Sequence, residues 1–417
     1  MSSTASSMPK SGSSGPTNPG FLPAEGRQGA IPACQIGWNL HSGCGWVGGQ
    51  PSRAIAASYR IGWVASHRII AQPSYAIAQG ASVHTVHICL LTNQDLNDPE
   101  LPKYDWPCDP RPHLPEADWH AVMLGEKAEA PREVRRLIRD GIDGRPIDVF
   151  FNLCDGGADQ HDLPGVEVIR VLERAGAIFT GATSECFEPT RRQIKTACKR
   201  LGIATPRGMI VRTQADVRQA ARKLRFPLFV KHHNSYASID IRRRSKAISK
   251  SGLMIQAKKF IARHGAALIE EYIDGDECTV LVAENPRDPW NPIAYPPVKY
   301  TFPKGEHFKH EDLKWVTYQD LKTAPVTNTQ LNGQLKWIGS ELFVEMKAAG
   351  YARCDVRVDG DGIPHILEIN ANCGIFYPRD AYASADDCIA LTPGGHPLFV
   401  RRLIAAARAR QRRMALA

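Results

Sequence analysis

The chain has 417 residues, of which 43% are hydrophobic and 23% charged, a balance that excludes a disordered or fibrous protein and allows two or three ordinary domains. The 52 Lys and Arg residues outnumber the 43 Asp and Glu residues, so the net charge of +9 favours anionic partners such as nucleotides, acidic substrates or nucleic acid. Eleven scattered cysteines without a CxxC pair argue against a disulfide framework or a zinc knuckle and indicate free thiols in a reducing compartment.

Residues 1–80 are rich in Ser, Gly, Pro and Ala and show no sustained hydrophobic periodicity. This composition predicts a largely disordered segment, in which we identify no functional motif. The N-terminus lacks the apolar core of a secretory signal, and no apolar run reaches the roughly 18 residues that a membrane helix needs. We therefore expect a cytoplasmic protein without a membrane partner, and the Ser-rich, acid-free start leaves an organelle transit peptide as the weaker alternative.

Residues 81–187 alternate predicted strands and helices. The strands are predicted at residues 83–91, 119–124 and 147–153, and the helices at residues 131–141 and 162–176. The second helix has Val166, Ile169, Val171 and Leu172 as candidate core positions. Alternation of this kind predicts a parallel sheet with crossover helices, which is an α/β domain.

Residues 188–395 follow a different pattern, because several predicted strands succeed one another without a helix between them. Helices are predicted at 190–202, 215–224 and 334–350, and strands at 208–211, 227–231, 267–283 and 351–370, the last two ranges broken by turns. Gly202 and Pro206 mark the end of the first of these helices. The pattern predicts an α+β domain with antiparallel strand pairs, and a domain boundary near residues 180–190.

Residues 396–417 predict a basic helix with Leu403, Ile404 and Ala407 on one side. A solvated end helix is the simpler interpretation, and attachment to RNA or to a membrane is the alternative. No stacking aromatic residue lies between its arginines, so we do not expect nucleic acid among the partners. A homodimer is one assembly that these features permit.

The stretch HILEINANCGIF, residues 365–376, places Glu368 and Asn370 on one face of a predicted strand, because side chains alternate along a strand. The preceding DGDG, residues 359–362, is a hairpin signal that predicts Arg353 opposite Glu368 and Asp355 opposite Ile366. One face would then carry all four polar side chains.

Two carboxylates and a carboxamide are hard ligands that suit Mg²⁺ or Mn²⁺ rather than zinc. Magnesium commonly shares its site with phosphate, so this face predicts a nucleoside triphosphate substrate. The alternative is an ordinary salt bridge between Arg353 and Glu368, with Asn370 capping a turn.

Two further motifs favour a nucleotide site. Lys231 ends the strand PLFVK before small polar residues, where it could meet phosphate oxygens. The alternative is a lysine that extends to solvent from a strand end. Glu277 follows the turn in LIEEYIDGDECTV and could accept both ribose hydroxyls, or be an exposed strand charge. Backbone groups of Glu271 to Ile273 could bind an adenine edge.

The order of these motifs resembles the ATP-grasp superfamily, in particular its D-alanine–D-alanine ligase branch, over roughly residues 83–400. The stretches VFFNLCDGG and HDLPGVEVIRVLERAGAIFTGAT are similar to the substrate-side domain of that branch. The resemblance implies a pre-ATP-grasp parallel-sheet domain at residues 81–187 followed by an ATP-grasp fold at residues 188–395, with ATP and Mg²⁺ (or Mn²⁺) as cofactors.

The resemblance also implies roles for single residues. Arg353 would stabilise an oxyanion, Lys231 would contact the ATP phosphates, and Glu277 would bind ribose. The adenine would be surrounded by Glu270, Glu271, Tyr272 and Ile273, the metal ions would be held by Asp355, Glu368 and Asn370, and further nucleotide contacts would come from Arg191, Lys195, Ser238 and Lys299.

The implied activity is that of an ATP-dependent carboxylate–amine ligase, which forms an amide or peptide bond through an acyl phosphate and releases ADP and phosphate. Its partners would be small molecules, either D-alanine or another amino acid or small peptide. No nucleophilic thiol is needed, so Cys354 and Cys373 are predicted to pack in the core. The loop Val298–Trp315 is a candidate lid, with Lys299, Lys304 and Lys309 over the phosphates, or else a solvated basic loop.

Three departures from the family pattern are visible. Arg191 and Lys195 stand where a lysine is usual, the phosphate loop HHNSYASIDI has no glycine, and Cys373–Tyr377 replaces a Pro-Gly pair followed by a small hydroxyl residue. The glycine-free loop favours the alternative of a nucleotide-binding pseudoenzyme with a sensing or scaffolding role. Retention of every predicted metal ligand argues against that alternative.

Overall fold

The computed structural model describes residues 85–104, 106–157, 163–234, 240–315 and 320–416. The chain divides into two units, Met1–Ile77 and Ala78–Ala417, and all the described residues belong to the second. The predictions made for residues 1–80 and for Ser238 lie outside the described residues.

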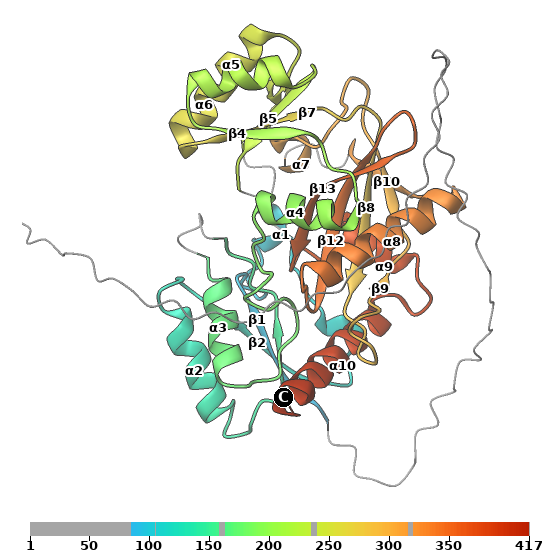
Figure 1. Ribbon diagram of the computed structural model, residues 1–417. Helices are drawn as coiled ribbons and strands as arrows, with labels where there is room; N and C mark the ends of the chain where they lie inside the picture. Colours follow the sequence, from blue (N-terminus) through green and yellow to red (C-terminus); the bar gives the residue numbers. More distant parts are fainter. Residues whose placement is uncertain (1–84, 105, 158–162, 235–239, 316–319, 417) are drawn as a thin grey trace, which may run out of the picture. The chain divides into compact units, whose positions relative to one another are not determined.

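A three-stranded parallel sheet opens the second unit (Figure 1). It has the strand order β2-β1-β3, with β1 at His87–Thr92, β2 at Asp118–Met123 and β3 at Val149–Asn152. Helices α2 (Ala130–Asp140) and α3 (Val166–Arg174) bury Val134, Leu137, Ile169 and Leu172 against one face of this sheet. The predicted parallel strands with crossover helices are confirmed.

A four-stranded antiparallel sheet follows, with the order β4-β7-β5-β6. Its strands are β4 (Gly208–Val211), β5 (Leu228–His232), β6 (Lys246–Ala247) and β7 (Ala267–Glu271), covered by α5 (Gln214–Lys223) and α6 (Lys250–His264). Our sequence analysis missed α6, although Leu253, Ala257 and Phe260 follow the helical spacing and all three are buried.

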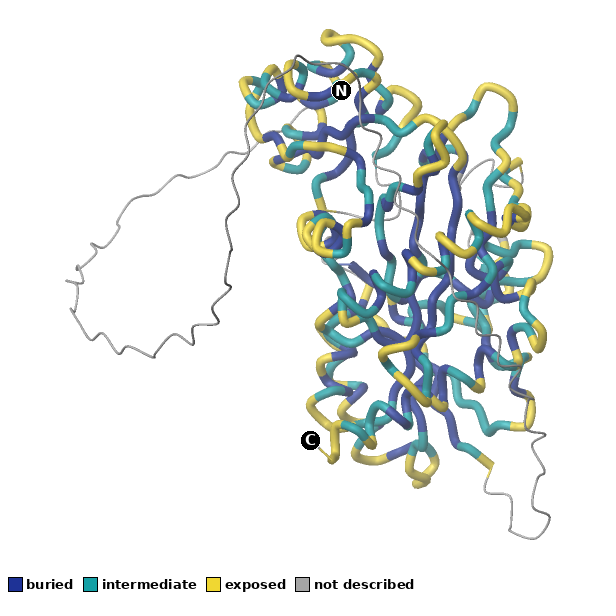
Figure 2. The backbone as a smooth tube through the Cα atoms, turned by 45° about the vertical axis from the view of Figure 1, so that its right-hand side comes forward, coloured by how far each residue is buried: buried dark blue, intermediate teal, exposed yellow. Residues whose placement is uncertain are grey.

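The largest sheet has six strands in the order β11-β10-β8-β12-β13, with β9 paired to β8. The strands are β8 (Asp276–Ala283), β9 (Ile293–Ala294), β10 (Val298–Thr301), β11 (Lys322–Pro325), β12 (Tyr351–Val358) and β13 (Pro364–Ala371). Helices α4 (Arg191–Leu201) and α8 (Thr329–Glu345) pack on one face. On the other face the core includes residues of α9 (Ser384–Ala390) and α10 (Gly395–Leu416). The short helices α1 (Leu101–Tyr104) and α7 (Glu311–Trp315) complete the described helices. Figure 2 shows buried strands flanked by exposed loops.

The β12–β13 hairpin has a register two residues away from the predicted one. Arg353 pairs with Asn370 and Asp355 with Glu368, so the prediction that Arg353 lies opposite Glu368 and Asp355 opposite Ile366 is wrong. The turn is one residue longer than a DGDG turn, because the Asp359 carboxylate accepts hydrogen bonds from the Asp361 and Ile363 amides. A bulge between Asp355 and Val356 shifts the register by one more residue, which gives the total of two.

The C-terminal helix α10 packs into the core through the predicted apolar side, on which Leu403, Ile404 and Ala407 are all buried. Two of its arginines, Arg410 and Arg413, pair with the buried Glu284 of the loop after β8 at 2.5 and 2.8 Å. Part of the basic face therefore docks the helix, while other arginines remain exposed. No helix among the described residues is both long and apolar enough to span a membrane.

Candidate active site

A cavity of about 690 Å³ is lined by residues from both antiparallel sheets, from α4 and from the loop after β13. This volume is typical of small-molecule sites. The structure brings eleven predicted residues together in its lining: Arg191, Lys231, Glu270, Glu271, Tyr272, Ile273, Glu277, Arg353, Asp355, Glu368 and Asn370.

The three predicted metal ligands lie side by side on β12 and β13. The amide nitrogen of Asn370, Nδ2, donates to Glu368 at 3.1 Å and to Asp355 at 3.3 Å. Thr279 on the neighbouring β8 donates to Asp355 Oδ1 at 2.6 Å and fixes that carboxylate. The β-bulge is what allows this convergence, because it sets Glu368 directly beside Asp355.

Both carboxylates of this set face an arginine. Arg353 makes a two-pronged contact with Asp355 at 3.1 and 3.0 Å, and Arg191 approaches Glu368 to 2.6 Å. Burial alone would raise the pKa of Glu368, but the charges of Arg191 and Lys231, together with the hydrogen bond from Asn370, lower the pKa overall. The pKa of Asp355 is lowered in the same way, with Arg353 and Lys309 overcoming the effect of burial. Both carboxyl groups are therefore ionised at neutral pH, as metal ligands must be.

These side chains fit a divalent magnesium-type cation. Two ionised carboxylates and a carboxamide provide hard oxygen atoms from two adjacent strands, β12 and β13. For the metal to bind, the amide of Asn370 would present its oxygen, which requires only a half-turn of the side-chain amide. Arg191 would also have to share Glu368 with the ion.

A second charged cluster is centred on Glu270 of β7. Its two carboxylate oxygens lie 2.6 Å from Lys195 and 2.6 Å from Lys231. Burial would raise the pKa of Glu270, but the two lysines reverse the effect and lower it to about 2. The pKa of Lys231 is lowered by its own burial and by the charge of Arg191. The predicted Lys195 reaches the site through Glu270 and is not itself part of the cavity wall.

Glu277 of β8 is held between two cations. It lies 3.1 Å from Arg357 of β12 and 3.1 Å from Lys309. Lys309 also approaches Asp355 to 3.8 Å, so it bridges the predicted ribose-binding and metal-binding residues. Burial works to lower the pKa of Lys309, but the surrounding anions, foremost Asp355, raise it overall.

Aromatic side chains line the cavity beside the predicted adenine-binding segment. Phe229 stacks on Tyr272 with ring centroids 6.1 Å apart and meets Phe308 edge-on at 5.0 Å. The Tyr272 amide already donates to Pro227 and the Glu271 amide to Arg207. Of the three residues proposed to bind an adenine edge through their backbone, Ile273 is therefore the one whose amide would do so.

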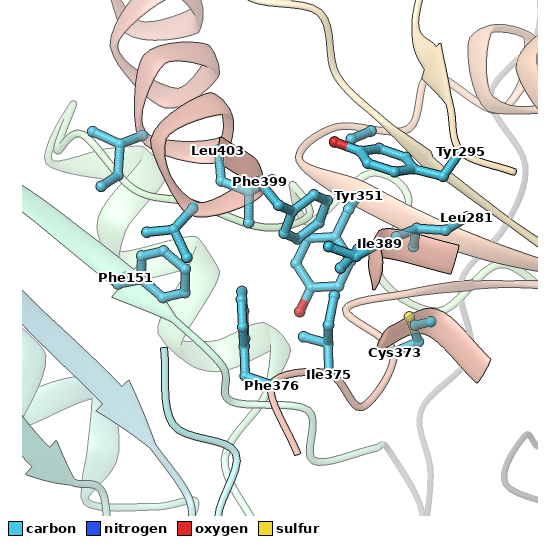
Figure 3. Packing of buried hydrophobic residues seen from close by; sticks show 14 of the residues in the cluster. Phe151, Leu281, Tyr295, Tyr351, Cys373, Ile375, Phe376, Ile389, Phe399 and Leu403 are labelled. Carbon is cyan, nitrogen blue, oxygen red and sulfur yellow. The ribbon is translucent and has the colours of Figure 1, made fainter. Parts of the chain in front are cut away.

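The cavity wall also includes Cys373, Gly374 and Tyr377 of the segment that departs from the family pattern. Residues Asn372 and Phe376 have left-handed backbone angles, with φ of 48° and 66°, and their neighbours hold them there. Asn372 accepts from the Ala182 amide at 2.9 Å, and the Phe376 amide donates to Asp386 at 2.8 Å. Figure 3 shows Phe376 packed close to Phe151 and Phe399.

The predicted lid supplies one lysine to the site. Lys309 lines the cavity, whereas Lys299 pairs with Asp276 at 3.2 Å, does not line the cavity and is 43% exposed at its side chain. Lys304 is exposed. Cys354 and Cys373 are buried as predicted, and burial raises the pKa of the Cys373 thiol to about 12.

Arg357 is the main site residue that our sequence analysis missed. It donates to Glu277, to the Gly275 carbonyl at 2.7 Å and to the His307 carbonyl at 2.9 Å, so it ties β12 to the turn before β8 and to the lid. The signal was present, because Arg353, Asp355 and Arg357 alternate along one strand face.

Comparison with known proteins places this geometry in a family. The family model described as "D-ala D-ala ligase C-terminus" matches residues 198–379. An uncharacterized protein of Sinorhizobium fredii, y4sG, is 30% identical over 241 residues, covering 55% of this chain and 67% of the relative. The D-alanine–D-alanine ligase of Cupriavidus metallidurans is 28% identical over 284 residues, covering 61% of this chain and 82% of the ligase.

Solved structures agree on the fold. The D-alanine–D-alanine ligase of Bacillus anthracis complexed with ATP has a TM-score of 0.55 at 17% identity, covering 79% of this chain and 99% of the ligase. The D-Ala:D-Ser ligase VanG of Enterococcus faecalis has a TM-score of 0.54 at 14% identity, covering 78% and 99%. The two antiparallel sheets that enclose the charged cavity are thus those of an ATP-grasp fold. Within that superfamily, the chain belongs to the D-alanine–D-alanine ligase-like branch.

Proposed function

We propose that the protein is an ATP-dependent carboxylate–amine ligase that forms an amide or peptide bond through an acyl phosphate. The observation that carries the proposal is the pair of carboxylates Asp355 and Glu368, both accepting from the Asn370 amide, in a cavity that is also lined by Lys231 and Lys309. Anionic ligands for a cation next to buried cations are what a metal–triphosphate complex requires.

In this proposal each charged cluster has one task. Asp355, Glu368 and Asn370 would hold Mg²⁺, which when bound neutralises charge on the transferred phosphoryl group. Lys231 would exchange part of its contact with Glu270 for a phosphate oxygen. Arg353, held in orientation by Asp355, would face the oxyanion that forms when the amine attacks the acyl phosphate.

The nucleoside would lie between the lysine clusters and the aromatic side chains. Tyr272 and Phe229 offer apolar surface to the base, and Glu277 offers its carboxylate oxygens to the ribose hydroxyls while Arg357 holds that carboxylate in place. Lys309 would contact the phosphates, because it already contacts Glu277 and Asp355, between which the phosphates are expected to lie.

The amino-acid substrates would bind beside a further group of residues that line the cavity. This group includes Asp155, Arg379, Tyr382 and Asp387, so side chains of both charge signs are present. A zwitterion needs such a mixture, since its ammonium and carboxylate groups require opposite partners. This favours an amino acid or a small peptide as substrate, with D-alanine as the first compound to test.

The test is release of ADP from Mg-ATP in the presence of pooled D- and L-amino acids. We expect release to depend on an amino acid and to fall by at least ~10²-fold in Glu368→Gln, because one carboxylate ligand to the metal is lost. Glu345→Gln is the matched control, since Glu345 forms a surface pair with Arg200 at 3.0 Å. ATP binding without turnover would contradict ligation and favour the sensing or scaffolding pseudoenzyme.

A further inference from the structure

Three side chains of metal-ligating type cluster at the amino ends of β1 and β2 in the parallel sheet. His87, Asp118 and His120 each offer one ligand atom, and these atoms all lie within 4.8 Å of one another. His87 pairs with Asp118 across β1 and β2, and His120 is two residues further along β2, so strand geometry places all three on one face.

His87 is oriented like a metal ligand. It is 1% exposed, and its Nδ1 lies 2.7 Å from the Pro146 carbonyl oxygen. A carbonyl can only accept, so Nδ1 is the donor, and the tautomer that fits this contact has its lone pair on Nε2. That Nε2 is buried and has no hydrogen-bond partner among the described residues. A histidine that donates one ring nitrogen to a backbone carbonyl and leaves the other bare is the usual arrangement in metal sites.

The other two residues complete the geometry. His120 Nε2 lies 3.4 Å from Asp118 Oδ1, close to the roughly 3.3 Å that separates two ligands of a tetrahedral ion with bonds of about 2.0–2.1 Å. The second oxygen of Asp118 is held by Arg145 at 2.6 Å, which fixes the carboxylate and leaves Oδ1 facing His120. Asp118 and His120 are half-buried, so an ion could enter from solvent.

We propose that His87, Asp118 and His120 bind a transition-metal ion of the zinc type. Two imidazoles and one carboxylate favour Zn²⁺, Co²⁺, Ni²⁺ or Cu²⁺ over Mg²⁺ and leave a fourth position for water. The cluster is made from the amino ends of β1 and β2, whereas Asp155, in the loop after β3, lines the cavity. A six-residue strand spans about 17 Å at ~3.3 Å per residue, so the cluster at its amino end is far from the cavity beyond its carboxyl end. The ion would therefore link β1 to β2 and take no part in the reaction.

The experiment uses the untagged full chain, freed of metal by a chelator and titrated with Zn²⁺ in excess Mg²⁺ against a chromophoric competitor. We expect one tight Zn²⁺ per wild-type chain, and binding weakened by at least ~10–100-fold in His120→Ala and in Asp118→Asn. Both substituted side chains are partly exposed, and circular dichroism of the metal-free variants verifies that they fold.

His365→Ala is the matched control. Its ring also faces a carboxylate, Asp359, at 2.8 Å, and one of its nitrogens is buried. In the part of the chain that the structure describes, that nitrogen has no hydrogen-bond partner and the pair has no third potential metal ligand beside it. This variant should bind Zn²⁺ as the wild type does. Equal Zn²⁺ binding by all four proteins, or no tight binding by the wild type, would overturn the proposal. Amino-acid-dependent ADP release should be unchanged in His120→Ala, which separates this site from the proposed ligase site.

Discussion

Glu270 connects the stability of the four-stranded antiparallel sheet to pH, and the substitution Glu270→Gln tests this connection. Its carboxylate is 5% exposed and contacts Lys195 and Lys231 at 2.6 Å each. The pKa is about 2 in the folded protein, against an ordinary value of 4.5. Because the folded pKa is the lower one, the carboxylate stabilises the fold at all pH values above about 4.5, and this stabilisation is lost as the pH falls towards 2.

The magnitude follows from the size of the pKa change. A carboxyl pKa of 4.5 in the unfolded chain and about 2 in the folded protein corresponds to roughly 3 kcal/mol of unfolding free energy at pH values where the carboxyl is ionised in both states. About 2 kcal/mol of that should be lost between pH 6 and pH 3. Other carboxyl groups titrate over the same interval, but they do so in the wild type and in the variant alike.

The assay is therefore a difference between two urea-denaturation series. At pH 6 we expect Glu270→Gln to be less stable than the wild type, and the gap should shrink by about 2 kcal/mol at pH 3. Glu345→Gln, which alters a surface pair, should differ from the wild type by less than about 1 kcal/mol at both pH values. A pH-independent gap for Glu270→Gln would refute the reasoning, because the two lysines would then not be holding a depressed carboxyl.

Three further predictions concern the packing around the site. Asn372→Ala should lower the unfolding free energy by about 1–3 kcal/mol in thermal denaturation, because the buried Ala182 amide loses its acceptor; an unchanged midpoint would contradict that bond. Glu284→Gln should cost about 3 kcal/mol and speed proteolysis of α10, since Arg410 is left in a largely buried place without its carboxylate; resistance equal to wild type would show that apolar packing alone holds the helix. Iodoacetamide at pH 8 should leave ADP release intact, because burial keeps the Cys373 pKa at about 12; loss of turnover that tracks labelling of Cys373 would contradict this.

The sequence predicted those features that depend on local periodicity. Alternation along β12 and β13 placed Asp355, Glu368 and Asn370 on one face, and the structure does bring these three together. The strand and helix alternation of residues 81–187 likewise predicted the parallel sheet. Both patterns repeat within a few residues, so they are visible without knowledge of distant contacts.

The register of the β12–β13 hairpin and the ion pairs of the site were harder to predict from the sequence. A turn lengthened by the Asp359 side chain and a single bulged residue displaced the hairpin by two residues, and neither has a distinctive pattern in the sequence. The pair of Arg191 with Glu368 joins residues far apart in the chain, and so does the contact of Lys195 with Glu270. Such pairings are set by how α4 lies against β13 and β7 in space, which local composition does not determine.

Transfer of an oxygen atom from the carboxylate substrate to phosphate tests the central proposal most directly. In the proposed reaction a carboxylate oxygen attacks the γ-phosphate, and the amine then displaces phosphate with that oxygen attached. With Mg-ATP and an amino acid labelled with ¹⁸O in its carboxyl group, mass spectrometry should find one ¹⁸O in each phosphate released and an amide in the organic product. Unlabelled phosphate released without an amide product would mean that the protein hydrolyses ATP without activating a carboxylate, and the proposed ligase activity would be wrong.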